Sequence, residues 1–463
     1  MMAGHAFDPT LLREYDLRGV VGQTLIDDDA FALGRAFATF LGEERPKVCV
    51  GRDGRLSSPS LSARLIEGLV SSGADVIDVG LGPTPMLYYA VHAFAADGGV
   101  MVTGSHNEPA YNGFKLTGRG ARPIYGDDIK ALGRLAGEGR FAEGKGKLRA
   151  EDIRDRYVTR LRDGLPRDRE KPLNVGWDAG NGAAGDVLRR LVATLPGRHV
   201  LLNDAIDGSF PSHHPDPTVP ENLDELIRAV ERERLDLGIA FDGDGDRIGV
   251  VDGRGRIVWG DQLVALLARD VIARRGKDAP IILDVKSSAA SMDHIAKALG
   301  GRPLLWRTGH SLIKAKMAET GALLAGEMSG HIFIADDYYG YDDALYAAVR
   351  LLSLLGGGEA LDRMLDRLPK AISTPEVRID CPEARKFGVV GEVLGRARAA
   401  GLEILDIDGI RATTADGWWL LRASNTQPAL VARAEASTAE GLARLKASLR
   451  RDLEACGVAV PDF

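Results

Sequence analysis

Short apolar runs alternate with amphipathic helical patterns along the first three quarters of the chain. In the first region, apolar runs of strand length stand at residues 47–52, 74–80 and 98–102. Pro59 lies near a predicted helix start and Gly73 near its end. Strands that alternate with helices build parallel sheets covered by helices, so this pattern predicts an α/β unit.

The same alternation returns twice further along the chain. The strand-like runs of the second cycle are 173–177, 199–202 and 235–241, with a helical pattern at 221–234. Those of the third cycle are 281–285, 304–306 and 322–325, with a helix after Asp342. We therefore expect three comparable α/β units of roughly a hundred residues each.

From about residue 375 the pattern changes. Two helical patterns, at 385–400 and 438–456, flank β-like runs at 404–407, 418–422 and 429–434. This arrangement predicts a separate, smaller α+β domain. The predicted domains are 1–150, 151–255, 256–370 and 371–463.

Composition narrows the class of protein. A net charge of -7 and a pI near 5.8 argue against a nucleic-acid binder, which normally carries a basic stripe. The most apolar helical stretch, residues 344–355, is short and contains Arg350, so no segment is expected to cross a membrane. Three widely spaced cysteines and a start without an apolar signal core favour a reduced, cytoplasmic location.

The first candidate for chemistry is the polar run 103–115, which follows the apolar residues 100–102. Ser105 should lie just past the carboxyl end of a strand, where ligands bind in open α/β sheets. A serine hydroxyl is a poor nucleophile alone, but His106 and Lys115 could relay a proton or neutralise phosphate. A turn without chemistry would explain a lone Gly-Ser-His, but it explains the whole run much less well.

The second candidate is the run Asp-Gly-Asp-Gly-Asp-Arg at 242–247. Asp242, Asp244 and Asp246 can converge on one hard cation, because the intervening glycines permit a tight backbone path. An EF-hand loop would need a glutamate where Gly253 stands, and a solvated acidic turn would leave three carboxylates repelling one another. The run therefore favours a metal site at the end of a strand.

Two further loops suit a sugar phosphate. In the run 326–331, Glu327 and Ser329 can point the same way and bind a pair of sugar hydroxyls, although a plain strand-to-strand turn explains this loop equally well. The run 422–428 combines a guanidinium, hydroxyls and an amide, which suits phosphate, although alone it resembles an ordinary Asx/ST turn. The segment 51–55 places more cations early in the chain, where single residues are more often structural.

In this order, the four loops resemble those of the α-D-phosphohexomutase family, and most closely its bacterial phosphomannomutase/phosphoglucomutase branch. The resemblance covers nearly the whole chain, from residues 15–19 to residues 422–426. It implies a heart-shaped molecule with four domains around a central cleft: three similar mixed α/β domains and a smaller, mobile α+β domain.

The resemblance also implies roles for individual residues. Ser105 would be a phosphoserine whose phosphate joins Asp242, Asp244 and Asp246 around Mg²⁺. Glu327 and Ser329 would bind sugar hydroxyls. The phosphate that is not reacting would be held by Arg422, Ser424, Asn425 and Thr426. The other residues expected to line the cleft, with catalytic or substrate-binding duties, are Tyr15, Arg18, His106, Lys115, Arg247, Lys286, His310 and His331.

The implied activity is reversible phosphoryl transfer between the 1- and 6-positions of mannose or glucose phosphates. It would pass through a hexose 1,6-bisphosphate that turns around in the cleft, with glucose 1,6-bisphosphate as activator. Alternatives are a phosphoglucosamine mutase, whose relatives more often carry Gln at the position of Met328, a Mg-dependent sugar phosphatase and a non-catalytic sensor. Glu108 departs from the Ser-His-Asn-Pro run of many relatives, which leaves the local geometry of that loop open.

Overall fold

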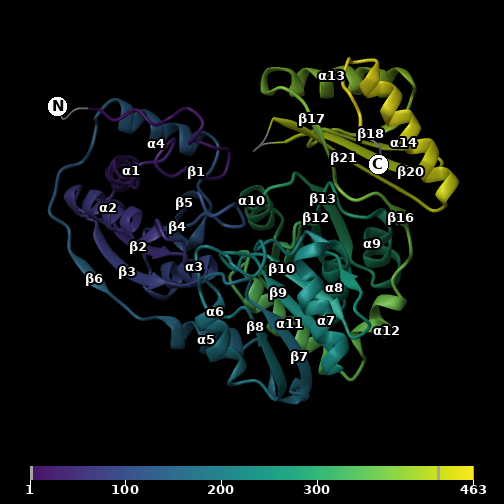
Figure 1. Cartoon of the computed structure of the whole chain (residues 1–463), viewed down its shortest axis with the longest axis horizontal. Coiled ribbons are helices and arrows are strands. Elements are labelled where there is room, and N and C mark those ends of the chain that lie inside the picture. Colours follow the sequence, from purple (N-terminus) through teal and green to yellow (C-terminus); the bar gives the residue numbers. More distant parts are fainter. Residues whose placement is uncertain (1–3, 425–427, 462–463) are drawn as a thin grey trace.

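The computed structural model describes residues 4–424 and 428–461. Within these residues the chain forms four sheets, which follow one another along the sequence and surround the centre of the molecule (Figure 1). The first sheet has the order β1-β5-β4-β2-β3-β6. Its elements and covering helices are β1 (Leu17–Val20), α1 (Asp27–Phe40), β2 (Lys47–Arg52), α2 (Ser58–Ser71), β3 (Asp75–Leu81), α3 (Thr84–Ala93), β4 (Gly98–Val102), β5 (Tyr111–Gly118), α4 (Asp127–Gly137) and β6 (Leu148–Ala150).

The second and third sheets repeat the mixed α/β plan, with orders β11-β10-β9-β7-β8 and β13-β12-β14-β15. The second unit contains α5 (Arg154–Arg162), β7 (Leu173–Asp178), α6 (Gly185–Val192), β8 (Gly197–Leu202), α7 (Asp224–Glu233), β9 (Leu237–Phe241), β10 (Ile248–Asp252) and β11 (Ile257–Val258). The third contains α8 (Gly260–Arg275), β12 (Pro280–Asp284), α9 (Ala289–Asp293), β13 (Arg302–Trp306), α10 (His310–Thr320), β14 (Leu324–Gly326), β15 (Ile332–Ile334), α11 (Ala344–Leu355) and α12 (Leu361–Asp366).

The C-terminal sheet is antiparallel, with the order β16-β21-β20-β19-β18 and with β17 also paired to β21. Its elements are β16 (Ile372–Ser373), β17 (Val377–Asp380), α13 (Glu383–Ala399), β18 (Glu403–Leu405), β19 (Ile410–Thr413), β20 (Gly417–Ala423), β21 (Ala429–Ala436) and α14 (Ala439–Glu454). Both helices pack on this sheet. The predicted fold class, three mixed α/β units plus a smaller α+β domain, is confirmed.

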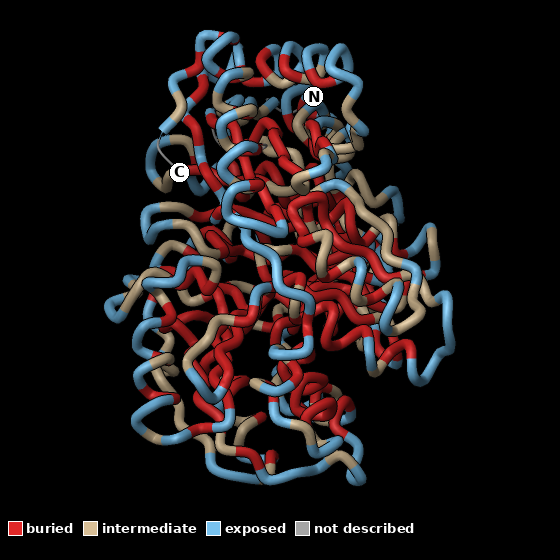
Figure 2. The backbone as a smooth tube through the Cα atoms, turned by 90° about the vertical axis from the view of Figure 1, so that its right-hand side faces the viewer, coloured by how far each residue is buried: buried red, intermediate tan, exposed pale blue. Residues whose placement is uncertain are grey.

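Buried side chains join the first three units and leave the fourth more separate. One apolar cluster includes Tyr88 of α3, Trp177 of β7, Leu283 of β12 and Leu351 of α11, so it crosses all three α/β units. The C-terminal domain has its own core, and among the apolar clusters of the described residues a small one around Trp418 connects it to the third unit. Buried stretches run through the interior of the molecule, and exposed ones lie mostly at its periphery (Figure 2). In the part of the chain described, no helix has the length and apolar character to cross a membrane.

Two predicted elements differ from the observed ones. The run 103–115 was expected to be a loop throughout, but residues 111–118 form β5, antiparallel to β4, so that Lys115 projects from a strand. The helix expected at 221–234 is divided into a short 3₁₀ helix, Pro220–Leu223, and α7. The strand β5 shows no alternation of apolar and polar residues in the sequence, because both of its faces are buried along nearly its whole length. Its polar residues have tertiary partners instead of facing solvent.

Candidate active site

Ser105 lies in the turn between β4 and β5, and 4% of it is exposed. Its backbone φ is +49°, a left-handed conformation that is uncommon for residues other than glycine. The Ser105 N–H donates to Thr103 Oγ1 at 2.8 Å, and its Oγ lies 3.3 Å from His106 Nδ1. A Cβ on Gly243 would come within 2.4 Å of the Ser105 carbonyl oxygen. Glycine at 243 therefore lets the serine loop and the aspartate loop meet directly.

Three buried carboxylates converge at the turn between β9 and β10. Asp242, Asp244 and Asp246 are each 0% exposed. Asp242 Oδ1 accepts the backbone N–H groups of Asp246 and Arg247, both at 3.1 Å, while Oδ2 accepts the Ser105 hydroxyl at 3.3 Å. The Oδ1 atoms of Asp244 and Asp246 are buried and have no hydrogen-bond donor among the described residues. The loop thus brings unsatisfied anionic oxygens beside the candidate nucleophile.

Lys115 is a cation already present in this cluster. Its Nζ donates to Asp244 Oδ2 at 2.8 Å and to Asp246 Oδ2. Burial opposes the charge of Lys115, but Asp244 and Asp246 raise its pKa above the ordinary value. Burial, with Asp246 and Asp244 adding to it, raises the pKa of Asp242 well above its ordinary range. Mutual repulsion among three buried carboxylates, two of which have oxygens without donors, is what a bound hard divalent cation would relieve, so this oxygen-rich donor set fits such an ion.

The second layer of the site determines which nitrogen of His331 carries the proton. Arg247 Nε donates to His331 Nε2 at 3.1 Å, and a guanidinium has no acceptor, so Nε2 is the unprotonated nitrogen. The proton is then on Nδ1, which lies 3.2 Å from Asp342 Oδ2. His310 Nδ1 lies 3.5 Å from the same oxygen, and Lys314 Nζ donates to Asp342 Oδ1 at 2.9 Å. Asp342 therefore sits between two histidines and one lysine.

Asp246, His331 and Asp342 are also close enough to share one ion. A metal there would need the lone pair of His331 Nδ1, yet the hydrogen bond from Arg247 requires the Nδ1 proton. In this arrangement Nδ1 therefore offers no lone pair to a metal, and His331 and Asp342, with His310 and Lys314 beside them, are called the relay.

Burial also determines the charge of two other histidines. Burial, reinforced by Arg247 and Arg18, lowers the pKa of His106 well below its ordinary value. Burial, reinforced by Lys314, does the same to the pKa of His310. Both imidazoles are therefore neutral near pH 7. Arg18 donates to the Gly104 carbonyl, which places this cation against the serine loop.

The loop between β14 and β15 carries Glu327, which is 1% exposed, and the half-buried Ser329. Glu327 Oε1 accepts the Gly309 N–H at 2.6 Å, and burial raises the pKa of this carboxyl. Tyr15, from the first unit, donates its hydroxyl to the Thr308 carbonyl at 3.0 Å. The segment immediately before His310 is thus held from both sides.

Arg422 lies where the C-terminal domain meets the third unit. Its Nε donates to Asp408 Oδ2 at 3.1 Å, and the same oxygen accepts the Thr308 N–H at 2.9 Å. Lys286 Nζ donates to Glu376 Oε2 at 3.0 Å. Arg422, expected to bind phosphate, and Lys286, expected to line the cleft, therefore both lie at this domain boundary.

Ser424 is 7% exposed and follows β20 directly. The predicted residues Asn425 and Thr426 lie outside the described residues.

The contacts link most of the predicted residues from Ser105 to Arg422. The sequence did not single out Asp342 or Asp408, because each acts on partners far away along the chain. It noted Arg55 only as one of several cations, but Arg55 donates to four carbonyl groups around Ser105. The alternation of arginine and aspartate in the segment 51–55 is the sequence feature that could have indicated a role for Arg55.

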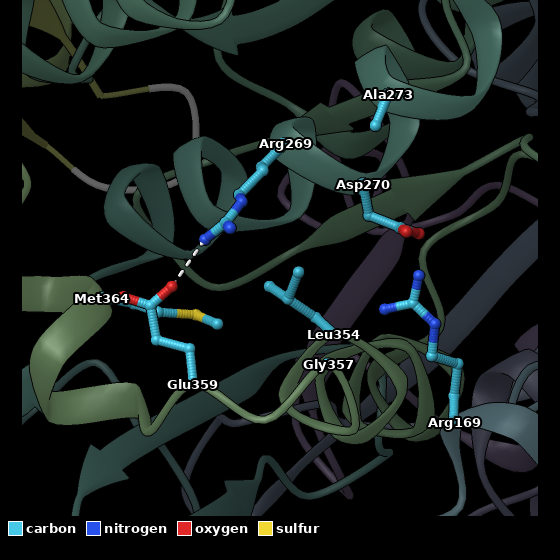
Figure 3. Close-up of a pocket in the computed structure, with 8 residues that line it drawn as sticks. All are labelled: Arg169, Arg269, Asp270, Ala273, Leu354, Gly357, Glu359 and Met364. Atoms are coloured by element: carbon cyan, nitrogen blue, oxygen red, sulfur yellow. Dashed lines mark hydrogen bonds and ion pairs between the residues drawn. The ribbon is translucent and has the colours of Figure 1, made fainter.

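A separate cavity of about 260 Å³ lies beside α8 and the end of α11 (Figure 3). Leu354 and Met364 line it, and Arg269 donates to Glu359 at 2.9 Å across it. No residue predicted for the site lines this cavity, so it is not part of the candidate active site.

Comparison with known proteins shows which proteins this chain is similar to. The four domain types described as phosphoglucomutase/phosphomannomutase alpha/beta/alpha domains I, II and III and C-terminal domain match residues 9–143, 155–255, 259–372 and 376–452. The phosphomannomutase/phosphoglucomutase of Pseudomonas aeruginosa is 45% identical over 454 residues, 98% of this chain and 97% of the relative. A phosphoglucomutase of Neisseria gonorrhoeae is 42% identical and covers 96% of each chain.

A crystal structure of a phosphoglucomutase/phosphomannomutase family protein from Burkholderia thailandensis superposes with a TM-score of 0.91. It is 41% identical and covers 98% of this chain and 100% of its own. With all four domains matched in order and with relatives above 40% identity over nearly the full length, this chain belongs to the phosphoglucomutase/phosphomannomutase family.

Proposed function

We propose that this enzyme moves a phosphoryl group reversibly between the 1- and 6-positions of hexose phosphates, through phospho-Ser105 and a hexose 1,6-bisphosphate. The observation that carries the proposal is the contact of Ser105 Oγ with Asp242, inside a cluster of buried carboxylates with unsatisfied oxygens. Phosphoryl transfer depends mainly on positioning and on stabilising negative charge, and this site supplies both.

The ion that we propose for the aspartate loop is Mg²⁺, held by Asp242, Asp244, Asp246 and a phosphate oxygen on Ser105. When bound, it would neutralise charge on the transferring phosphoryl group. Lys115 holds the two carboxylates beside it in place and adds a second positive charge. Arg18 and Arg247 approach from the serine loop and the relay, and would face the same phosphoryl oxygens.

Proton transfer is the task that we propose for His331. Its Nε2 carries the lone pair, and it is free to accept a sugar hydroxyl proton once Arg247 turns toward a phosphate. Neutral His106 and His310 would serve as hydrogen-bonding partners in the cleft. The charge near Nδ1 comes from Asp342, which favours the imidazolium that such a step creates.

A bisphosphate intermediate needs a site for its other end. We propose that Arg422, Ser424, Asn425, Thr426 and Lys286 hold the phosphate that is not reacting. Tyr15 would close the substrate site from the first unit. Because the sugar must turn around between the two transfers, this second site has to accept either end of the intermediate. Glucose 1,6-bisphosphate would serve as the activator that restores phosphate to Ser105.

Sugar recognition would fall to Glu327 and Ser329, through the 3- and 4-hydroxyls. These two groups roughly exchange places when the ring turns around, so one pair of contacts serves both orientations. Glucose and mannose differ at C2, which these contacts would not inspect. We therefore propose that both sugars are substrates.

A coupled assay tests the proposed function. Glucose 1-phosphate and mannose 1-phosphate are supplied with Mg²⁺ and glucose 1,6-bisphosphate, and formation of the 6-phosphates is followed together with inorganic phosphate. We expect comparable kcat/KM for the two sugars and little free phosphate. Inorganic phosphate in excess of isomerised sugar would instead show a phosphatase, and a difference of several orders of magnitude between the sugars would overturn dual use.

A further inference from the structure

The serine loop is held from below by a buried arginine. Arg55 is 1% exposed, and its guanidinium donates to backbone carbonyls around the loop. Nη1 donates to the carbonyls of Glu108 and Tyr111 at 2.6 and 3.0 Å, and Nη2 donates to those of Ser105 and Asn107 at 2.8 and 2.5 Å. A planar fork with several donors can hold separate carbonyls at fixed angles, which a single ammonium cannot do.

The same arginine is itself fixed on both sides. Its Nε lies 3.3 Å from Asp53 Oδ2, and that oxygen also accepts the Gly104 N–H at 3.0 Å. On its other side the guanidinium lies 5.1 Å from the ring centroid of Phe210, which belongs to the second unit. A Cβ on Gly104 would come within 2.2 Å of Arg55 Nε, so the loop rests directly on the guanidinium.

The contacts of Arg55 bear on two properties of the site: the backbone conformation of Ser105 and the position of its hydroxyl. Ser105 has a left-handed backbone conformation, which persists only when its surroundings stabilise it. The loop also has to keep the Ser105 hydroxyl against Asp242, which belongs to a different unit. Because Arg55 contacts both the serine loop and Phe210, it ties the position of Ser105 to the unit that carries the aspartates.

We propose that Arg55 is a positioning residue, which holds the strained nucleophile loop in register with the aspartate loop of the neighbouring unit. This inference rests on the proposed function of Ser105 as the phosphorylated nucleophile. It also explains how the loop keeps its shape with Glu108 where many relatives have proline, since Arg55 binds the Glu108 carbonyl and leaves its side chain exposed.

The test is Arg55→Lys, which keeps the charge but loses the planar fork. A shift of about 1 Å in a reacting group lowers rates by about 100-fold, so kcat should fall by roughly that factor. The KM for glucose 1-phosphate should change by less than about threefold, because the sugar and distal phosphate contacts stay intact. Hydrogen exchange of the amides at 104–108 should accelerate. The control is Arg35→Lys, which alters a buried arginine that contacts Ser72 in the same unit, away from the serine loop.

The outcomes separate the two proposals. If wild-type enzyme shows no mutase activity, the proposed function is wrong, whatever the exchange data show. If wild-type is active and Arg55→Lys keeps kcat within twofold with unchanged exchange at 104–108, the positioning role of Arg55 is wrong. Should Arg55→Lys fail to fold, Phe210→Leu replaces it: a severalfold loss in kcat with unchanged KM supports the inference, and unchanged kcat overturns it.

Discussion

Asp343 offers a sharp test of how burial sets charge at the junction of the first three units. It caps α11 by accepting the Tyr346 N–H at 2.9 Å, and it accepts the hydroxyls of Tyr157 and Tyr338 at 2.9 and 2.7 Å. Burial nevertheless raises the pKa of Asp343 to about 6, because removing the carboxylate from water costs more than these donors recover.

The magnitude follows from linkage between proton binding and folding. An unfolded aspartate has a pKa near 3.9, so the raised value corresponds to about 3 kcal/mol of stability present at low pH and absent at neutral pH. Between about pH 4 and pH 6, Asp343 keeps its proton in the folded state but loses it in the unfolded chain. Stability is therefore complete below about pH 4, falls as the pH rises to about 6 and is constant above that.

The perturbation is Asp343→Asn, whose amide keeps an oxygen for the Tyr346 N–H while the two tyrosine hydroxyls rotate to meet the amide group. The free energy of unfolding of this variant relative to wild type should rise by about 2 kcal/mol between pH 4.5 and pH 8. For a chain of this length that is a relative gain of about 2 °C in Tm, measured by thermal unfolding at both pH values.

Asp168→Asn, at an exposed residue, is the control for replacing an aspartate by asparagine, and it is measured at the same two pH values. A difference between Asp343→Asn and wild type that stays constant, or that falls, as the pH rises would refute the account of this carboxyl.

Three further substitutions test the site. Asp342→Asn should lower kcat by about 100-fold or more, because His331 loses the carboxylate that would stabilise its imidazolium; an unchanged kcat would contradict the relay. Asp408→Ala should raise the KM for hexose phosphate severalfold with a smaller effect on kcat, since Arg422 loses its carboxylate partner. Lys115→Met should bind Mn²⁺ more tightly by calorimetry while kcat falls, because no ammonium competes for the carboxylates; weaker binding would count against the metal site.

The sequence predicts those features that short-range patterns encode. Ser105 and the aspartates stand directly after apolar strands, so their place at the ends of β4 and β9 follows from pattern alone. The helix after Asp342 was also predicted, and it begins at Ala344 with Asp343 as its N-cap. The domain boundaries at residues 150, 255 and 370 and the roles of the individual site residues stay predictions.

Tertiary contacts account for what the sequence could not supply. Arg55 acts through backbone carbonyls roughly fifty residues away, and a carbonyl has no sequence signature. Lys115 was placed in a loop, whereas its position on β5 is what lets it reach Asp244 from another unit. The repulsion expected among the three aspartates is therefore partly offset within the protein, because Lys115 pairs with two of them.

The central claim is that Ser105 carries the phosphoryl group between the two ends of the sugar. The direct measurement is mass spectrometry of the dephosphorylated enzyme before and after it meets glucose 1,6-bisphosphate, followed by addition of excess glucose 6-phosphate. We predict one phosphoryl group that appears on Ser105, leaves with the sugar as bisphosphate, and is absent in Ser105→Ala together with mutase activity. Full activity in Ser105→Ala, or a phosphoryl group on another residue, would contradict the mechanism.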